Sequence, residues 1–343
     1  MIYPWQKNLW QELIERKTGL SHALLLHGQG GIGKRDFAIS LAHAMLCEAP
    51  GDRGTPCGHC LACGWLAAGT HPDLHLLHPD SEAAGESTSQ DEAKDDKEKK
   101  QNHLITVAQV RELIDSVTLS ASRGGMRVIL IHPAEAMNVQ AANALLKTLE
   151  EPPPNSLFIL VSHQLPRLLP TIRSRCLKIA MPVPQRQQAR EWLREQGVAE
   201  PDSCLAQAGF APLRALVLNE AEYREKRADF LARLDEKLDP FSLAEVGEKL
   251  ELAWVLNWLQ TWVYDLISAR ATGNIRYHPD FSDKLTALSG LIDMSRMLAF
   301  QNDLLVAQRS LHHPLNARLL LEQLLLSFWQ SMNRKQEGAR VVR

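Results

Sequence analysis

The sequence predicts an α/β domain built on a parallel sheet, followed by a region made only of helices. Short apolar runs alternate with helical periodicity over the first half of the chain, which is the pattern of a doubly wound sheet. A glycine-rich loop follows the first apolar run. The alternation stops after Ile179, and beyond that residue only helical patterns remain.

In the α/β part, helical spacing predicts helices at 5–16, 34–47, 107–117 and 141–150. Apolar runs predict four strands, at 22–27, 73–77, 127–131 and 157–162. Parallel strands end at a common edge of their sheet, so the loops that follow these strands should gather there.

In the helical part, Pro182 and Pro184 interrupt the chain, and short helices are expected at 185–196, 202–208 and 212–218. Longer helices are expected from residue 223 onward, notably at 244–270 and 313–332. The first of these long helices carries a stripe of large apolar residues: Leu252, Trp254, Leu256, Trp258, Leu259 and Trp262. Such a stripe is typical of a helical core, and its tryptophans also suggest that part of it is a subunit interface.

Size and charge narrow the class of protein. A chain of 343 residues is long enough for two or three domains, and 45% hydrophobic residues can fill their cores. A net charge of -2 gives no general attraction for DNA, so nucleic-acid contact would need a local patch or a partner. The most apolar run, 252–267, contains Asn257, Gln260 and Asp265, so no membrane span is expected.

Four cysteines lie between the first helix after the glycine loop and the next strand: Cys47, Cys57, Cys60 and Cys63. The C-x2-C-x2-C run brings three thiolates within reach of one ion, and Cys47 can supply a fourth, so the spacing predicts a closed structural zinc site at 47–63. Such a site has no open position for catalysis.

A disulfide pair and an iron–sulfur cluster are the alternatives at this site. The chain opens with Met1-Ile2-Tyr3 and not with a charged and then apolar leader, so a reducing cytoplasm is expected, where such spacing favours metal. The upstream position of Cys47 differs from the ferredoxin arrangement and favours zinc over a cluster. His59 lies within the run but is not needed as a ligand.

Residues 80–103 are predicted to form a mobile insertion. Within 80–100, eight acidic residues face four lysines, with no aromatic or branched apolar residue. We interpret the segment as a solvated loop, with docking of a partner as the alternative. Its charge is opposite to that of a DNA-binding tail.

The glycine-rich loop, G-Q-G-G-I-G-K-R at 28–35, follows a strand and begins a helix, which is the setting of a phosphate-binding loop. Backbone N–H groups of such a loop can turn toward a phosphate at the helix N-terminus, and a lysine adds a positive charge. The candidate nucleotide-binding residues are Gly28, Gly31, Gly33, Lys34 and Arg35.

Two features needed to bind Mg²⁺ are missing, one in this loop and one after the third strand. Arg35 stands where Ser or Thr would bind the ion, and a guanidinium cannot do so. His132 and Pro133 follow the third strand where an acidic pair would stand. We therefore expect no intrinsic ATP hydrolysis, although nucleotide binding without hydrolysis stays open. Replacement of the lost acid by Glu135, Glu150 or Glu151 is a less favoured alternative.

These motifs resemble the bacterial clamp-loader branch of the AAA+ ATPases. The resemblance depends on the phosphate loop, the four-cysteine insert after its helix, the run N-A-L-L-K-T-L-E-E-P-P at 143–153, and Ser174-Arg175-Cys176. It covers residues 5–179 in motifs and the remaining chain in architecture only. The active motor subunits of that branch keep the magnesium-binding residues, whereas this chain does not.

The resemblance implies three domains: an ATPase-like domain at 1–180, a small helical lid at 181–219 and a helical collar at 220–343. It also implies partners, namely motor subunits and a delta subunit in a five-membered ring that loads a sliding clamp onto primed DNA. ATP sites of this family lie between neighbouring subunits, and Arg175 matches the arginine that completes the next subunit's site. A guanidinium there stabilises the charge that develops during phosphoryl transfer.

Other family positions carry over less clearly. Ser162 or His163 matches a polar sensor position, and Arg214 lies near a lid position that contacts nucleotide in active relatives.

Two further functions are weighed against that of a non-hydrolysing subunit. The chain could be an active motor with a variant magnesium site, or a zinc-dependent DNA-binding module. The last is disfavoured because Arg53 is the sole Lys or Arg within 47–65.

Overall fold

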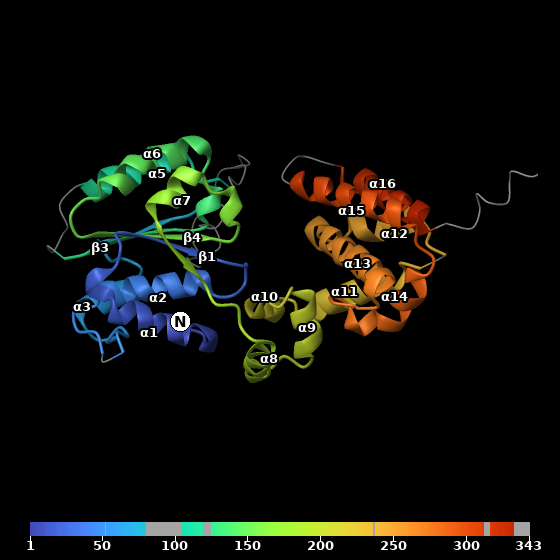
Figure 1. Ribbon diagram of the computed structural model, residues 1–343, viewed down its shortest axis with the longest axis horizontal. Helices are drawn as coiled ribbons and strands as arrows, with labels where there is room; N and C mark the ends of the chain where they lie inside the picture. The colour runs from blue at the N-terminus through green and yellow to red at the C-terminus, as the bar shows by residue number, and fades with distance from the viewer. Residues whose placement is uncertain (52, 80–103, 119–124, 236, 312–315, 333–343) are drawn as a thin grey trace, which may run out of the picture. The chain divides into compact units, whose positions relative to one another are not determined.

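The computed structural model describes residues 1–51, 53–79, 104–118, 125–235, 237–311 and 316–332. It divides into two compact units, Met1–Gln188 and Ala189–Arg343. The segment 80–103, predicted to be a mobile insertion, lies outside the described residues. The first unit combines strands with helices, and the described part of the second is helical, which confirms the predicted change of pattern (Figure 1).

The first unit contains a parallel sheet of five strands in the order β2-β3-β4-β1-β5. The strands are β1 (Ala23–His27), β2 (Leu74–Leu77), β3 (Arg127–Ile131), β4 (Ser156–Ser162) and β5 (Leu177–Ala180). β3, β4 and β1 are neighbours, so the residues that follow these three strands meet at one edge of the sheet.

Helices cover both faces of this sheet (Figure 1). One face carries α2 (Lys34–Leu46), with α1 (Lys7–Glu15) and α3 (Leu61–Ala67) on the same side, and the other carries α5 (Val107–Thr118), α6 (Val139–Glu150) and α7 (Pro170–Arg175). Because both faces are covered, β1, β3 and β4 are almost entirely apolar and buried, as expected for internal parallel strands.

The fifth strand, β5, was not among the four predicted. It lies at the edge of the sheet beside β1, and only Ile179 of its four residues is buried. A short strand whose other side chains are exposed shows no apolar run, so its sequence gives little signal. The pairing with β1 is a tertiary contact and determines the strand.

The second unit is described as helices from α8 to α16. Their bounds are α8 (Arg186–Glu195, which begins in the first unit), α9 (Pro201–Gln207), α10 (Pro212–Val217), α11 (Ala221–Ala232), α12 (Pro240–Glu248), α13 (Leu252–Thr272), α14 (Ser282–Ser289), α15 (Met294–Arg309) and α16 (Ala317–Met332). The single helix predicted at 244–270 is wrong, because a turn separates α12 from α13. Gly247 lets α12 approach α16: a Cβ at this residue would lie 2.9 Å from Leu321 Cδ1.

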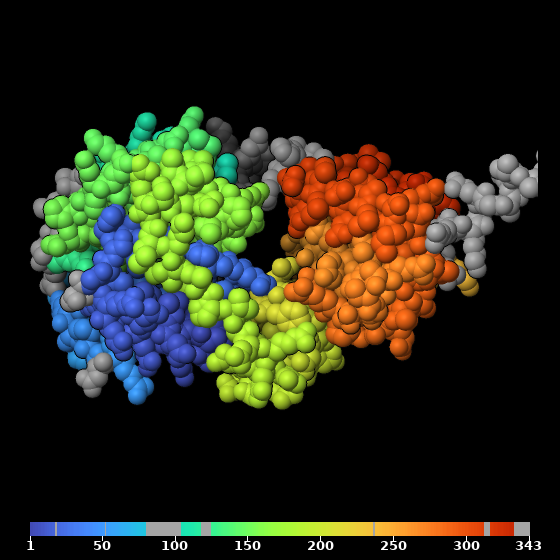
Figure 2. All heavy atoms as spheres, in the orientation of Figure 1, coloured from blue at the N-terminus to red at the C-terminus, as the bar shows by residue number. Residues whose placement is uncertain are grey.

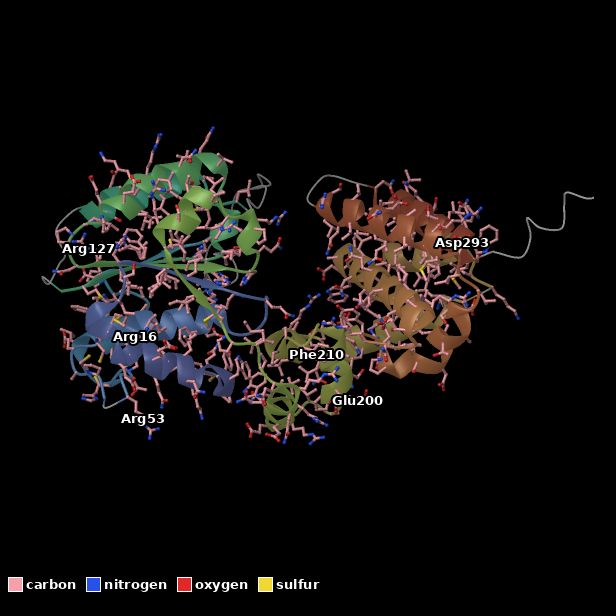
Figure 3. The ribbon with its side chains drawn as sticks, in the orientation of Figure 1. Arg16, Arg53, Arg127, Glu200, Phe210 and Asp293 are labelled. Atoms are coloured by element: carbon pink, nitrogen blue, oxygen red, sulfur yellow. The ribbon has the colours of Figure 1, made fainter. Side chains whose placement is uncertain are left out.

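The apolar stripe of α13 is mainly core. Leu256, Trp258, Leu259 and Trp262 are at most 1% exposed. Beside them the buried carboxylate of Asp265 accepts hydrogen bonds from the backbone N–H groups of residues 276–278, which fixes the turn after α13. The same turn places Arg276 over the ring of Phe210, 5.5 Å from its centroid (Phe210 is labelled in Figure 3).

Candidate functional site

The phosphate loop joins β1 to α2 and is held in place by the N-terminal segment η1 (Pro4–Gln6). Trp5 Nε1 and Gln6 Nε2 donate hydrogen bonds to the carbonyl of Ile32, at 3.0 and 2.9 Å. Gly33 has a positive φ of 82°, and a Cβ there would lie 2.3 Å from the ring of Tyr3. Glycine is therefore required both by the backbone and by the covering ring.

Lys34 folds back onto its own loop. The residue is only 2% exposed, and Nζ donates hydrogen bonds to the carbonyl oxygens of Gly28, at 2.8 Å, and Gln29. Burial lowers the pKa of this ammonium group to about 8, opposed by the nearby carboxylate of Glu135. The lysine that would contact a phosphate is thus bonded to the backbone of the loop that carries it.

Two histidines occupy the sheet edge beside the loop. His132 follows β3 and His163 follows β4, and their Nε2 atoms lie 3.2 Å apart. Glu135 Oε1 accepts a hydrogen bond from the backbone N–H of His163 at 2.8 Å. Arg35, which follows the loop lysine, offers no oxygen ligand. Among the described residues of this edge, His132 and Pro133 stand where an acidic pair is expected, and the imidazole of His163 lies beside that of His132.

Both imidazoles are held neutral. Burial lowers the pKa of His132 to about 3, and His163, Arg35, Lys34 and His78 add to the shift by repelling its charged form. Burial also lowers the pKa of His163. At neutral pH one uncharged ring can therefore donate to the other.

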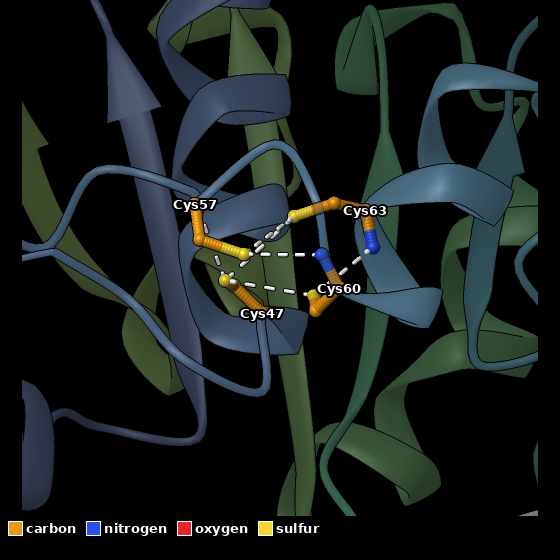
Figure 4. Close-up of side chains that lie close together, drawn as sticks. All are labelled: Cys47, Cys57, Cys60 and Cys63. Carbon is orange, nitrogen blue, oxygen red and sulfur yellow. Dashed lines mark hydrogen bonds between the residues drawn. The ribbon is translucent and has the colours of Figure 1, made fainter.

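The four cysteines gather at one point, on the loop after α2 and the start of α3 (Figure 4). Their sulfur atoms all lie within 4.8 Å of one another, and the pairs that approach most closely are 3.7 to 4.0 Å apart. A disulfide would need about 2.0 Å, and all four thiols are free. A tetrahedral ion with bonds of about 2.3 Å would separate its sulfur ligands by about 3.8 Å, so the cluster fits a single ion.

Backbone N–H groups of the insert point at the sulfurs. Those of Cys57, Cys60 and Cys63 lie 3.3 to 3.4 Å from the Sγ atoms of Cys47, Cys57 and Cys60, respectively. The contact from Cys63, with another from Glu48, lowers the pKa of Cys60 to about 6. Burial instead raises the pKa of Cys63 to about 12.

Arg175 lies at the end of α7, on a segment that forms part of the visible surface of the first unit (Figure 2). Its side chain is 30% exposed and forms an ion pair with Glu150 at the end of α6. The carbonyl oxygen of Thr171 accepts a further hydrogen bond from Nη1 at 3.0 Å. This pairing was not predicted, because it joins residues 25 positions apart.

The remaining sequence-predicted positions are dispersed. Ser162 is fully buried at the end of β4, next to His163. Arg214 donates to Asn257 Oδ1 at 3.1 Å, so in the second unit it contacts α13. Cys176 and Cys204 are buried and do not belong to the four-cysteine cluster, which fits apolar rather than ligating cysteines.

Sequence reasoning missed the pairing of His132 with His163, although the signal was present. Each histidine follows the end of a buried strand, and the carboxyl ends of parallel strands meet at one edge. The neighbouring positions of β3 and β4 in the sheet, which only the structure supplies, decide that the two rings touch.

Comparison with known proteins identifies the family. A family model described as "DNA polymerase III, delta subunit" matches residues 4–185, and a second model, for the C-terminal part of the delta subunit, matches residues 221–330. A DNA polymerase III subunit delta' from Pseudomonas aeruginosa is 38% identical, over 96% of this chain and 98% of its own. This chain belongs to the delta' subunit family of DNA polymerase III.

Other members of the delta' family are also similar over most of the chain. The subunit from Haemophilus influenzae is 31% identical over 89% of this chain and 91% of its own, and that from Escherichia coli is 30% identical over 94% of each. A solved gamma subunit-related protein from Thermotoga maritima aligns with 96% of this chain and 100% of its own, at 18% identity and a TM-score of 0.43. In the described part of the chain, none of the helices has the length and apolar character to cross a membrane.

The neutral histidine pair predicts a pH dependence of folding. Between pH 6.5 and about 3, the unfolded chain binds a proton at His132 that the folded chain does not, so acidification lowers the free energy of unfolding. This ring should contribute up to about 1.4 kcal/mol per pH unit in that window. Urea unfolding at pH 7.0 and 5.5 should show a smaller pH slope for His132→Gln than for the unaltered chain. An unchanged slope would contradict burial of the neutral ring.

Proposed function

We propose that this chain is a non-hydrolysing subunit of a clamp loader, which completes the ATP site of a neighbouring motor subunit. The observation that carries the proposal is the sheet edge at the phosphate loop. Lys34 is bonded to the loop's own carbonyls, Arg35 replaces the magnesium ligand, and His132 occupies the place of an acid. Phosphoryl transfer without a magnesium clamp lacks its main electrostatic stabilisation.

The assembly follows from the family and from the resemblance of the motifs. The relatives are named as subunits of DNA polymerase III, which is a DNA-directed DNA polymerase of DNA replication. The partners are then motor subunits and a delta subunit in a five-membered ring, with the sliding clamp and primed DNA reached through that ring. Residence in the cytoplasm follows from the same role. We assign residues 1–180 to the ATPase-like domain, 181–219 to the lid and 220–343 to the collar.

Arg175 is the residue that would act on the neighbour. It is partly exposed at the end of a short helix, and a guanidinium placed at a γ-phosphate stabilises the charge that develops there. Its alternative role is a surface ion pair with Glu150. Exposed pairs of this kind contribute little to stability, which leaves room for a function in the ring.

An active motor with a variant magnesium site is the second candidate function. Glu135 is the acidic residue whose charge acts on Lys34, so in this second function it would replace the missing acidic ligand of Mg²⁺. One of its oxygens already accepts a hydrogen bond from the His163 backbone, and Arg35 stands where a Ser or Thr hydroxyl would be the second protein ligand.

The first test separates the two functions. The isolated chain, supplied with Mg²⁺ and ATP, should release no phosphate above a protein-free blank, because its loop lacks magnesium ligands. A hydrolysing motor subunit of the same ring serves as the positive control. Turnover that is abolished by Glu135→Gln would establish the motor function instead.

The second test concerns the arginine. In a reconstituted ring on primed DNA, Arg175→Ala should slow ATP hydrolysis at the neighbouring site by on the order of 10³-fold, the range known for arginine fingers. Arg16→Ala removes another surface arginine, paired with Glu12, and should leave hydrolysis unchanged. Equal activity of the two variant rings would refute the role of Arg175.

We further propose that the metal held by Cys47, Cys57, Cys60 and Cys63 is structural zinc. Four thiolates around one ion close its coordination and leave no position for a substrate. Among the described residues the only metal-ligating group of three or more His, Cys, Asp or Glu side chains is this one. The ion would fasten the loop after α2 to the start of α3, a stretch with few apolar side chains.

The zinc site gives the third test. Replacing both Cys60 and Cys63 by Ser should release about one zinc ion per chain and lower the melting temperature, because binding free energy of a structural ion is also folding free energy. His59→Ala, which lies between the ligands, should retain the ion. Metal content by mass spectrometry and thermal unfolding measure both effects. Iron in place of zinc, or a metal-free chain with unchanged melting, would overturn the assignment.

A further inference from the structure

The arrangement of α6 and α7 points to a second residue in the action on the neighbouring subunit. We propose that Glu150 is a positioning residue: it holds the Arg175 guanidinium in the orientation from which it reaches the neighbour's nucleotide. This inference rests on the proposed function of Arg175. Glu150 itself contacts no nucleotide and acts through the arginine.

The guanidinium of Arg175 is held by hydrogen bonds within the chain. Glu150 Oε1 accepts hydrogen bonds from Nε, at 2.8 Å, and from Nη2, while the carbonyl oxygen of Thr171 accepts one from Nη1 at 3.0 Å. A guanidinium has five N–H bonds. Three are used within the chain, which leaves one on each terminal nitrogen for an oxygen outside it. Glu150 thus fixes the plane of the group and still leaves donors for a phosphate.

The backbones of Glu150 and Arg175 are both held next to residues of the hydrophobic core. Glu150 follows Leu149, which is 1% exposed, and Arg175 precedes Cys176, which is 7% exposed. Leu149, Cys176 and Ile172 of α7 belong to the same hydrophobic core cluster. The backbone positions of the pair are therefore set by packing, and the remaining freedom is rotation within the arginine side chain. A carboxylate that restricts this rotation reduces the entropy lost when the arginine engages its target.

A purely structural role for the pair is the opposing explanation. The Glu150 side chain is 50% exposed and that of Arg175 is 30% exposed, so solvent screens their attraction and the fold gains little from it. The N-terminal part of α6 is instead fixed by Asn138, whose Oδ1 accepts a hydrogen bond from the Ala141 N–H at 2.8 Å. Loss of the Glu150 carboxylate should therefore slow ATP hydrolysis by the ring and leave the stability of the chain unchanged.

The chain offers a matched control in the next residue. Glu150 and Glu151 are both exposed acids at the end of α6, and the ion pair is made by Glu150. Full-length chains with Glu150→Gln or Glu151→Gln would be assembled into the ring, and ATP hydrolysis would be measured on primed DNA. At the site next to this chain we expect Glu150→Gln to lower kcat on the order of tenfold, with the KM for ATP unchanged, because only the approach to the transition state is impaired. Glu151→Gln should match the unaltered ring, and Glu150→Asp should recover part of the loss.

A double substitution separates failure of this inference from failure of the proposed function. If Glu150 acts through the arginine, adding Glu150→Gln to Arg175→Ala should cause no further loss. If Arg175→Ala alone leaves hydrolysis unchanged, the proposed function and this inference both fall. If Arg175→Ala slows hydrolysis but Glu150→Gln behaves like Glu151→Gln, only the positioning role is refuted. Faster hydrolysis with Glu150→Gln would also overturn it, since the carboxylate would then restrain the arginine. Equal melting temperatures of the single variants confirm that folding is not the cause.

Discussion

Parallel strands end at one edge of the sheet, and the site at the phosphate loop depends on this constraint. β1, β3 and β4 are neighbours, so the residues that follow them lie close together whichever side chains they carry. In this chain those residues supply a buried ammonium and two neutral imidazoles, with Glu135 as a single carboxylate close by. Such a set can hold the loop together through internal hydrogen bonds. It includes neither the Ser or Thr hydroxyl nor the acidic pair that hold Mg²⁺ beside an active phosphate loop.

Contacts within the chain stabilise the phosphate loop. Tyr3, Trp5 and Gln6 cover it, and Lys34 bonds to its carbonyls, so the turn from β1 to α2 keeps its shape through contacts made by the chain itself. A fixed α2 in turn fixes Cys47 at its end, which is one corner of the cysteine cluster. The opposite face carries α6 and α7, whose ends present Glu150 and Arg175. One sheet thus supports the four-cysteine cluster, which could hold a metal ion, on one side and Arg175 on the other.

Much of this could be predicted from the sequence, because the informative signals were local. The strand, glycine loop and helix at 23–46 follow one another along the chain, and the spacing of the four cysteines alone predicts a cluster that could hold one metal ion. The positions of Arg35 and His132 along the chain were enough to predict that magnesium ligands are absent there. The features that escaped prediction depend on tertiary contacts: β5 is an exposed edge strand defined by pairing with β1, and the Glu150–Arg175 pair joins two helices. The turn between α12 and α13 was hidden because apolar residues continue on both sides of it.

The central claim is that the phosphate loop has lost its magnesium site, and calorimetric titration of the isolated chain with ATP, with and without Mg²⁺, tests it most directly. If Lys34, Arg35 and the histidine pair occupy the site as described, Mg²⁺ should leave the affinity for ATP unchanged, whether that affinity is weak or zero. A many-fold gain in affinity on adding Mg²⁺, abolished by Glu135→Gln, would show that the chain holds the ion after all and would contradict the account.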